Sequence, residues 1–157
     1  MRKYIFILSL ISFPLLFIGC KKSEVTTASV QINDSQYVGI GTSDEPFGKI
    51  IVSVSESKAK INDVKVVLNG TTELSDIESI KLYSTATDTS FNAASATLLG
   101  EIATPQTDTV VIKIKKTLPI GENNLWIASN VSEQSKEGNT MLQLMILYAR
   151  TNHLKAV

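Results

Sequence analysis

The residues that most often carry out catalysis or bind metals are scarce in this chain. It has one histidine, His153, and one cysteine, Cys20, among 157 residues. A zinc site needs three or four ligands, mostly nitrogen or sulfur, and an activated nucleophile needs a neighbouring base. No Gly-x-Ser-x-Gly, phosphate-loop or Gly-x-Gly-x-x-Gly motif is present. The sequence therefore predicts no zinc site, no catalytic triad and no cofactor.

Carboxylates are the remaining groups that could do chemistry. Asp44 and Glu45 are adjacent, and Asp76 lies two residues from Glu78, but neither pair belongs to the run of alternating acids that an EF-hand calcium loop requires. A glycosidase needs two carboxyl groups about 5 to 10 Å apart, and the spacing marks no pair for that role. We expect these acids in solvated loops. A stand-alone hydrolase is a third hypothesis, after the two given below.

Aromatic side chains could bind a sugar by stacking on its apolar face. Trp126 lies in the apolar run of residues 125–128, which favours a place in the core. Tyr83 alternates with Leu82 and is expected on the opposite, wetter face of its strand. We take Tyr83 and Trp126 as the candidate ligand-binding residues, with Tyr83 the better candidate for stacking.

The N-terminus has the composition of an export leader. Arg2 and Lys3 form a basic start, residues 5–18 carry no charge, and a glycine precedes Cys20. A positive start, a short apolar run and a small residue are typical of a signal peptide. The run is shorter than the roughly 20 residues of a membrane span, and Pro14 interrupts it. An uncleaved N-terminal anchor is the alternative.

Residues 17–20, Phe-Ile-Gly-Cys, resemble a lipobox, the site at which bacterial lipoprotein signal peptidase cuts before a diacylated cysteine. The resemblance implies that residues 1–19 are removed and that Cys20 is lipidated. Acylation also removes a lone thiol that has no disulfide partner within the chain, and two or three acyl chains make a stable tether. Lys21 follows the cysteine, as in lipoproteins sent to the outer membrane. We expect a protein lipid-anchored there, at the periplasmic face or the cell surface.

Length and charge fit one small domain beyond the leader. The chain carries 15 basic and 15 acidic residues, and it is long enough to bury a core without disulfides. No basic patch typical of nucleic-acid binding is present, because the densest group, Lys113, Lys115 and Lys116, alternates with Val and Ile as on a solvated strand face.

Domain boundaries follow from composition. Residues 20–35 are polar and rich in Ser and Thr, and we expect the lipidated cysteine and a tether there. A first short strand around Val30 and Ile32 is the alternative for part of this segment. Residues 36–157 are expected to form the folded domain.

From about residue 36 the sequence alternates between apolar and polar positions, which predicts strands with one buried face. The segments with this pattern are residues 49–55, 61–69, 80–84, 109–115 and 141–148, with a short apolar run at 125–128. Turn-forming residues fill the gaps, for example at 43–46 and 121–124. About seven to nine short strands of this kind predict an all-β, two-sheet antiparallel β-sandwich.

One segment has a helical signature. Ser75 and Glu78 have the spacing of a capping box, and we expect a single helical turn at residues 74–78 that leads into the next strand. A longer helix that reaches Tyr83 is the alternative. The last predicted strand is rich in helix formers, so a helix is the alternative there too.

Several stretches resemble the N-terminal domain of bacterial sialidases that carry Asp-box (BNR) repeats. Residues 66–69 read Val-Val-Leu-Asn, and residues 74–87 contain Leu-Ser-Asp-Ile followed by Lys-Leu-Tyr. Residues 117–127 contain Gly-x-Asn-x-Leu-Trp-Ile, similar to the family's Gly-x-Asn-x-Phe-Trp-Ile. The resemblance spans about residues 45–150. It implies a β-sandwich that is carbohydrate-binding or accessory and that precedes a six-bladed catalytic propeller.

The chain departs from whole sialidases because the propeller is missing. No Ser-x-Asp-x-Gly-x-x-Trp box occurs. Sialidases hold the sugar carboxylate with three arginines, whereas Arg150 is the only arginine after the leader. We therefore expect no enzyme activity from this chain. It either works alone or is the remnant or split N-terminal part of an exo-alpha-sialidase.

Two hypotheses for its function remain. The leading one is a membrane-tethered, non-catalytic module that binds glycans, in particular sialoglycoconjugates. Its expected partners are the membrane, a glycan and a sialidase catalytic domain, and no nucleic acid. The second is a surface adhesion or protein-interaction module that binds no sugar, which an exposed apolar patch or an open edge strand would support.

Overall fold

The computed structural model describes residues 24–32, 39–55, 58–68, 70–138 and 144–149. Across these ranges the chain forms eight strands and one short 3-10 helix (η1). In chain order the elements are β1 (Glu24–Ile32), β2 (Glu45–Ser55), β3 (Ala59–Leu68), η1 (Leu74–Asp76), β4 (Ile77–Ala86), β5 (Thr97–Ala103), β6 (Thr109–Leu118), β7 (Gly121–Val131) and β8 (Leu144–Ala149).

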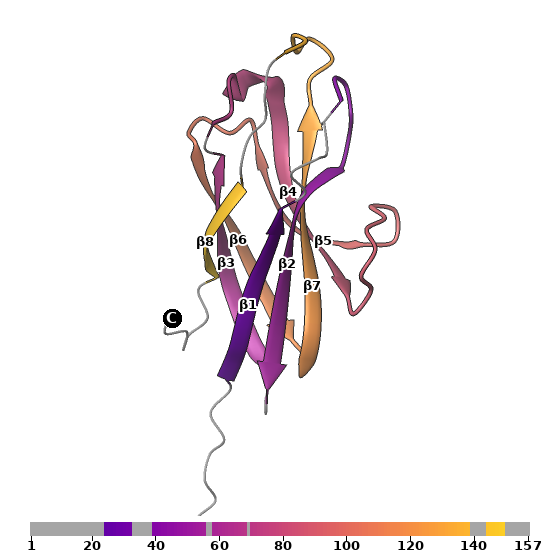
Figure 1. Ribbon diagram of the computed structural model, residues 1–157, viewed down its shortest axis with the longest axis vertical. Coiled ribbons are helices and arrows are strands. Elements are labelled where there is room, and N and C mark those ends of the chain that lie inside the picture. Colours follow the sequence, from indigo (N-terminus) through magenta and orange to yellow (C-terminus); the bar gives the residue numbers. More distant parts are fainter. Residues whose placement is uncertain (1–23, 33–38, 56–57, 69, 139–143, 150–157) are drawn as a thin grey trace, which may run out of the picture.

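The strands form two antiparallel sheets. Five pair in the order β1-β2-β7-β4-β5, and three pair in the order β6-β3-β8. The labels of the three-stranded sheet lie together on the left of Figure 1, and those of β2, β7, β4 and β5 lie to their right. The predicted all-β, two-sheet antiparallel sandwich is confirmed, as is the predicted number of strands.

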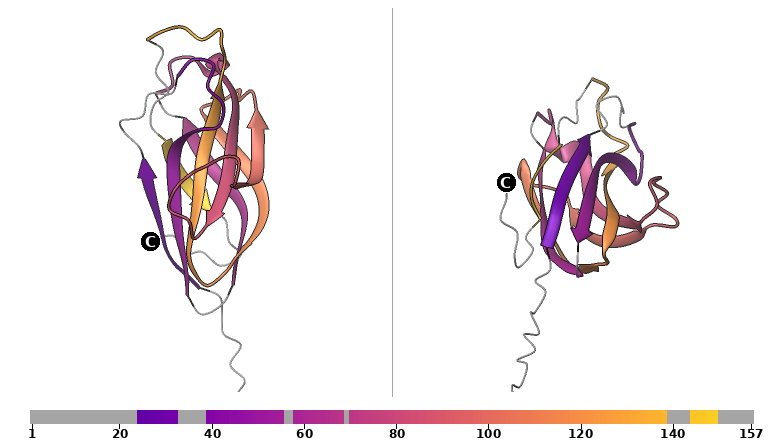
Figure 2. Two further views of the ribbon diagram at one scale, coloured as in Figure 1. Left: turned by 90° about the vertical axis from the view of Figure 1, so that its right-hand side faces the viewer. Right: turned by 60° about the horizontal axis from the view of Figure 1, so that its bottom comes forward.

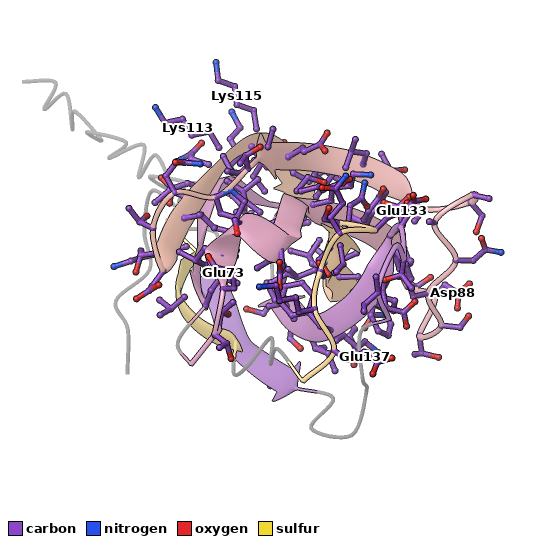
Figure 3. The ribbon with its side chains drawn as sticks, turned by 90° about the horizontal axis from the view of Figure 1, so that it is seen from above. Glu73, Asp88, Lys113, Lys115, Glu133 and Glu137 are labelled. Atoms are coloured by element: carbon purple, nitrogen blue, oxygen red, sulfur yellow. The ribbon has the colours of Figure 1, made fainter. Side chains whose placement is uncertain are left out.

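The inward faces of both sheets meet in one apolar core. In β6 exposed residues alternate with buried or half-buried ones, as the period of two predicted, and in β3 the same alternation is interrupted once, at the irregularity between Ile61 and Asp63. Lys113 and Lys115 point away from the sheet (Figure 3). Burying each aliphatic side chain contributes about 1.5 to 3 kcal/mol. The most deeply buried large side chains are Ile50, Ile61, Leu68, Ile77, Ile80, Leu82, Ile112, Leu118, Leu125 and Ile127.

Strand β5 has no counterpart among the predicted strands. Its side chains are exposed or half-buried, and Gly100 interrupts any alternation. A Cβ at Gly100 would lie 2.7 Å from Ile112 Cγ2 and 3.3 Å from the carbonyl oxygen of Lys113. The glycine therefore allows β5 of one sheet to approach β6 of the other, which closes this side of the sandwich.

The helical turn forms as predicted, but without a capping box. η1 leads directly into β4, so the alternative of a longer helix is wrong. Ser75 Oγ donates to Glu73 Oε1 at 3.0 Å, and no side chain caps the turn. Glu78 already belongs to extended β4, where its carbonyl oxygen accepts from the Thr104 N–H at 2.7 Å.

Several strands are longer than predicted. β1 occupies much of the segment expected as a tether, so the alternative of a strand around Val30 and Ile32 is the one that forms. β2 and β7 begin inside stretches predicted as turns. In β7 the Asn123 amide donates to the carbonyl oxygens of Pro119 and Gly121, both at 3.0 Å, so this turn-forming residue is used inside a strand.

The C-terminal segment is a strand, β8, over the part that the structure describes. The leader, Cys20, residues 141–143 and His153 lie outside the described residues. Within the described ranges, no helix has the length and apolar character needed to cross a membrane.

Candidate functional site: the outer face of the five-stranded sheet

The outer face of the five-stranded sheet gathers most of the polar and aromatic contacts outside the core. Cα pairing places Lys49 of β2, Trp126 of β7, Tyr83 of β4 and Leu98 of β5 in one row across four neighbouring strands. The residues next to them in β7 and β4, such as Leu125, point into the core. By alternation, this row faces outward.

A loop between β4 and β5 covers two of these side chains. Phe91 in this loop lies 5.4 Å from the Tyr83 ring, edge to face, and 5.6 Å from the Trp126 ring (centroid distances). Such pairs contribute about 0.5 to 1.5 kcal/mol beyond the area they bury. Tyr83 is 6% exposed and Trp126 is 9% exposed. We call Tyr83, Phe91 and Trp126 the aromatic cluster.

Hydrogen bonds hold the covering loop to the sheet. Trp126 Nε1 donates to Thr85 Oγ1 at 3.1 Å, and that hydroxyl donates to the Asp88 carbonyl oxygen at 2.6 Å. Asp88 Oδ1 accepts from the backbone N–H and the hydroxyl of Ser90 at 2.9 and 2.7 Å. The hydrogen bond from the Ser90 backbone, and then the one from its hydroxyl, keep the pKa of Asp88 below its usual value. The loop thus begins with a turn fixed by side chains.

A lysine borders the aromatic cluster. Lys49 Nζ lies 5.0 Å from the centroid of the Trp126 ring, within range of a cation–π interaction. The same ammonium donates to the Thr89 carbonyl oxygen at 3.3 Å. An ammonium has three donor hydrogens, so this half-exposed group retains donors for an anionic ligand.

Asp44 fixes the other side of the cluster. Its Oδ1 accepts from Tyr83 Oη at 2.6 Å and from Lys81 Nζ at 2.8 Å, and its backbone N–H donates to Asn130 Oδ1 at 2.9 Å. Its φ of 56° is a left-handed conformation that Asp tolerates better than most residues. We call Asp44, Lys81 and Tyr83 the Asp44 clamp.

The clamp shifts the titration of two of its members. Burial raises the pKa of Asp44, but the hydrogen bonds from Lys81 and Tyr83 outweigh it, so the pKa lies below its usual value. Burial, and then the hydrogen bond to the Asp44 carboxylate, raise the pKa of Tyr83. At neutral pH the clamp therefore holds an ionised Asp44 carboxylate beside a neutral Tyr83 phenol.

Asn124 is a buried amide on the same face. By alternation along β7 it points to the side of Trp126, and it is fully buried. Neither its Nδ2 nor its Oδ1 has a hydrogen-bond partner among the described residues. Buried polar groups are nearly always paired, so Asn124 is an exception within this face of the sheet.

The sequence of this sandwich matches a known family. Residues 26–144 match the family described as the N-terminal domain of BNR-repeat neuraminidase, and this match covers more than half of the chain. The chain belongs to this family. The resemblance inferred from residues 66–69, 74–87 and 117–127 is thereby confirmed.

Other comparisons of this chain add little. No curated protein sequence matches it. Among solved structures, the C-terminal domain of a chitobiase from Bacteroides fragilis is similar, with 10% sequence identity and a TM-score of 0.35. That likeness covers 80% of this chain and 95% of the chitobiase domain.

The structure brings together the two candidate residues. Tyr83 and Trp126 are Cα partners on adjacent strands. Tyr83 faces away from the main core, as expected, but Phe91 and Ala96 pack against the pair. Trp126 is buried in this second, outer cluster and not in the main core. Ligand binding by either residue stays a prediction, and stacking on an open ring requires the covering loop to move.

Sequence reasoning missed the other residues of the site. Asp44 is separated from Lys81 and Tyr83 by 37 and 39 positions, and no local motif marks that contact. An aromatic residue in a polar loop, Phe91, was the one signal available. Within the described part of the domain, no three acidic, His or Cys residues lie close enough together to hold a metal ion.

Proposed function

We propose that this chain is a membrane-tethered, non-catalytic accessory module that binds sialylated glycans at the aromatic cluster. The proposal rests on membership of the neuraminidase N-terminal family. The observation that carries it is the placement of an ammonium, an aromatic cluster and an unpaired buried amide on one face of one sheet.

The chemistry of these groups suits an acidic sugar. The Lys49 ammonium pairs with the sialic acid carboxylate, and the half-buried Phe91 and the exposed Leu98 contact apolar parts of the sugar. A shift of the loop that carries Phe91 would expose the Trp126 ring for stacking and the Asn124 amide for sugar hydroxyls.

A catalytic role is not part of the proposal. The whole chain contains two arginines, Arg2 and Arg150, so it cannot supply the three that bind the sugar carboxylate in sialidases. On this face, the carboxylate of Asp44 is engaged by Lys81 and Tyr83. A hydrolytic acid would instead need a free carboxyl group beside the sugar.

The tether belongs to the same proposal. Residues 17–20 supply the lipobox-like sequence, so Cys20 carries the acyl chains, and Lys21 favours the outer membrane as the destination. In this arrangement the module holds sialylated glycans close to the envelope, where a separate catalytic domain can act on them.

Isothermal titration of the mature chain in detergent micelles, with sialyllactose and with lactose, tests the glycan site. We expect binding of sialyllactose only. Lys49→Gln should weaken it about fivefold, because an exposed ion pair contributes about 1 kcal/mol. Phe91→Ala should weaken it further, since it removes apolar contact with the sugar.

Lys113→Gln is the matched control, since this lysine lies on the other sheet and points away from it. It should leave the affinity unchanged. Equal affinity for lactose and sialyllactose, or no binding by a folded chain, would remove glycan recognition from the account.

A second candidate function, binding to a protein, is supported by the burial of the Tyr83 and Trp126 rings beneath the β4–β5 loop. Because Tyr83 and Trp126 are so little exposed while Leu98 beside them is 47% exposed, the same face could dock against a protein, such as a sialidase catalytic domain. Co-sedimentation with that domain, combined with a negative glycan titration, would favour the interaction module.

A further inference from the structure

We propose that one end of the sandwich rests on the bilayer surface, with Ile120 in the headgroup layer and lysines around it facing anionic lipids. This inference rests on the lipid anchor at Cys20 in the proposed function, and it assigns a membrane-contacting surface to residues of the folded domain.

Five strand termini meet at this end. Cα pairing joins Glu24, where β1 begins, to Ser55, where β2 ends. It also joins Ala59, the first residue of β3, to Leu118, the last residue of β6, and β7 starts just after the β6–β7 turn. In Figure 1 this end is the lower one, and it comes forward in the right-hand view of Figure 2. We call it the basal end.

The length of the tether brings the basal end close to the membrane. Four residue steps separate Cys20 from Glu24, where β1 begins. A fully extended chain spans at most about 3.3 to 3.6 Å per residue, so the acylated cysteine lies within about 14 Å of the start of β1. A tether this short keeps the start of β1, and with it the basal end, near the headgroups.

An exposed apolar side chain is found at this end. Ile120 is 60% exposed, more than any other large hydrophobic side chain that the structure describes. It lies in the tight turn between β6 and β7, where Gly121 has a φ of 106°. A single apolar residue at the tip of a turn, with lysines nearby, fits the apolar–polar boundary of a bilayer.

The charge of the basal end complements an anionic surface. Lys58 and Lys60 are exposed beside the start of β3, Lys115 is exposed near the end of β6, and Lys116 is half-buried there. Among the described residues within a few positions of this end, four are lysines and two are glutamates: Lys58, Lys60, Lys115, Lys116, Glu24 and Glu122. Anionic lipids attract such basic segments.

The opposite end carries the opposite charge. Figure 3 looks onto that end, where the side chains of Glu73, Glu133 and Glu137 lie. Glu78 and Asp108 are exposed there as well, and together these acids outnumber the exposed Lys136 of the loop that carries Glu133. The separation of charge orients the domain, because the field of an anionic surface favours the lysine-bearing end and disfavours the acidic one.

A fluorescent probe on the lipidated chain tests this contact. Ile120→Cys is labelled with NBD in vesicles of phosphatidylglycerol and phosphatidylcholine, where acylated Cys20 takes up no label. We expect emission at shorter wavelength and quenching by nitroxide-labelled lipid. The matched control is Val111→Cys, which is 42% exposed near the far end of β6 and should keep aqueous, unquenched emission.

Further variants separate the docking from the anchor. The pair Lys58→Glu and Lys60→Glu should reduce quenching at position 120, whereas Lys113→Glu should not. Suppose that the wild type takes up no label, so that Cys20 is acylated. If the probe at position 120 then shows aqueous, unquenched emission, the docking is overturned. If the wild type takes up label, the anchor is wrong, and the probe is moved to a Cys20→Ser chain. If the probe on the Cys20→Ser chain shows aqueous emission, the docking is overturned too. If nitroxide-labelled lipid quenches it, the basal end contacts the membrane even without the anchor.

Discussion

Replacing Trp126 with alanine should lower the free energy of unfolding by about 3 kcal/mol, the lower end of the range for large aromatic truncations. The substitution removes the ring that packs against Phe91, the contact with the Lys49 ammonium and the hydrogen bond to Thr85 Oγ1. The covering loop then loses its main support on the sheet. Urea denaturation followed by circular dichroism measures the change.

Leu98→Ala is the matched control for Trp126→Ala. It lies in the same cross-strand row but is largely exposed, so its effect should stay within about 0.5 kcal/mol. A loss below about 1 kcal/mol for Trp126→Ala, or equal losses for the two variants, would mean that the aromatic cluster does not hold the loop to the sheet.

The second large effect is expected at Asp44. Asp44→Ala should cost about 3 kcal/mol. Of this, about 2 kcal/mol comes from the charged hydrogen bonds with Lys81 and Tyr83. About 1 kcal/mol comes from placing alanine at a φ of 56°. Asp44→Asn tolerates that conformation and keeps an acceptor, so it should cost about half as much.

The same residue sets a pH dependence. The pKa of Asp44 is lower in the folded chain than its ordinary value of 3.8. Its contribution to stability is therefore fully present above the unfolded-state pKa and is lost as the pH falls through the folded-state pKa. The difference in unfolding free energy between wild type and Asp44→Asn should be constant near neutral pH and shrink below about pH 4. A difference that does not change on acidification would show that folding does not lower the pKa of Asp44.

Much of the fold could be predicted from local pattern. In β3 and β6 the alternation of apolar and polar residues gave the buried face correctly, because each of these strands has one face in the core and a more exposed one. In β4 it gave the inward face, but the outward face is largely buried as well. β5 was missed, since its burial is partial and Gly100 is there for contact with Ile112 of the other sheet. That requirement comes from tertiary packing and leaves no period in the sequence.

The candidate site could be predicted only in part. Alternation placed Tyr83 on the outer face, whereas the apolar run at residues 125–128 favoured the core for Trp126, which lies in the outer cluster instead. The cover over both rings depends on where the loop with Phe91 folds back, and the Asp44 clamp joins residues far apart in the chain. Neither contact follows from spacing along one strand. The burial of the Tyr83 and Trp126 rings could therefore not be predicted from the sequence.

The covered rings change what a binding experiment should probe. Tyr83 bonds to Asp44 and packs against Phe91, so truncating it perturbs the fold as well as any ligand site. Phe91 and Lys49 are more accessible, and their replacement separates ligand contact from stability more cleanly. The glycan hypothesis is therefore best tested at the rim of the aromatic cluster.

Mass spectrometry of the chain purified from the membrane fraction of its bacterial host tests the central claim, an acylated module held at the envelope. We predict a mature protein that begins at Cys20, lacks residues 1–19 and carries two or three acyl chains on that cysteine. A full-length polypeptide from the soluble fraction, with Met1 present and a free thiol on Cys20, would contradict the account.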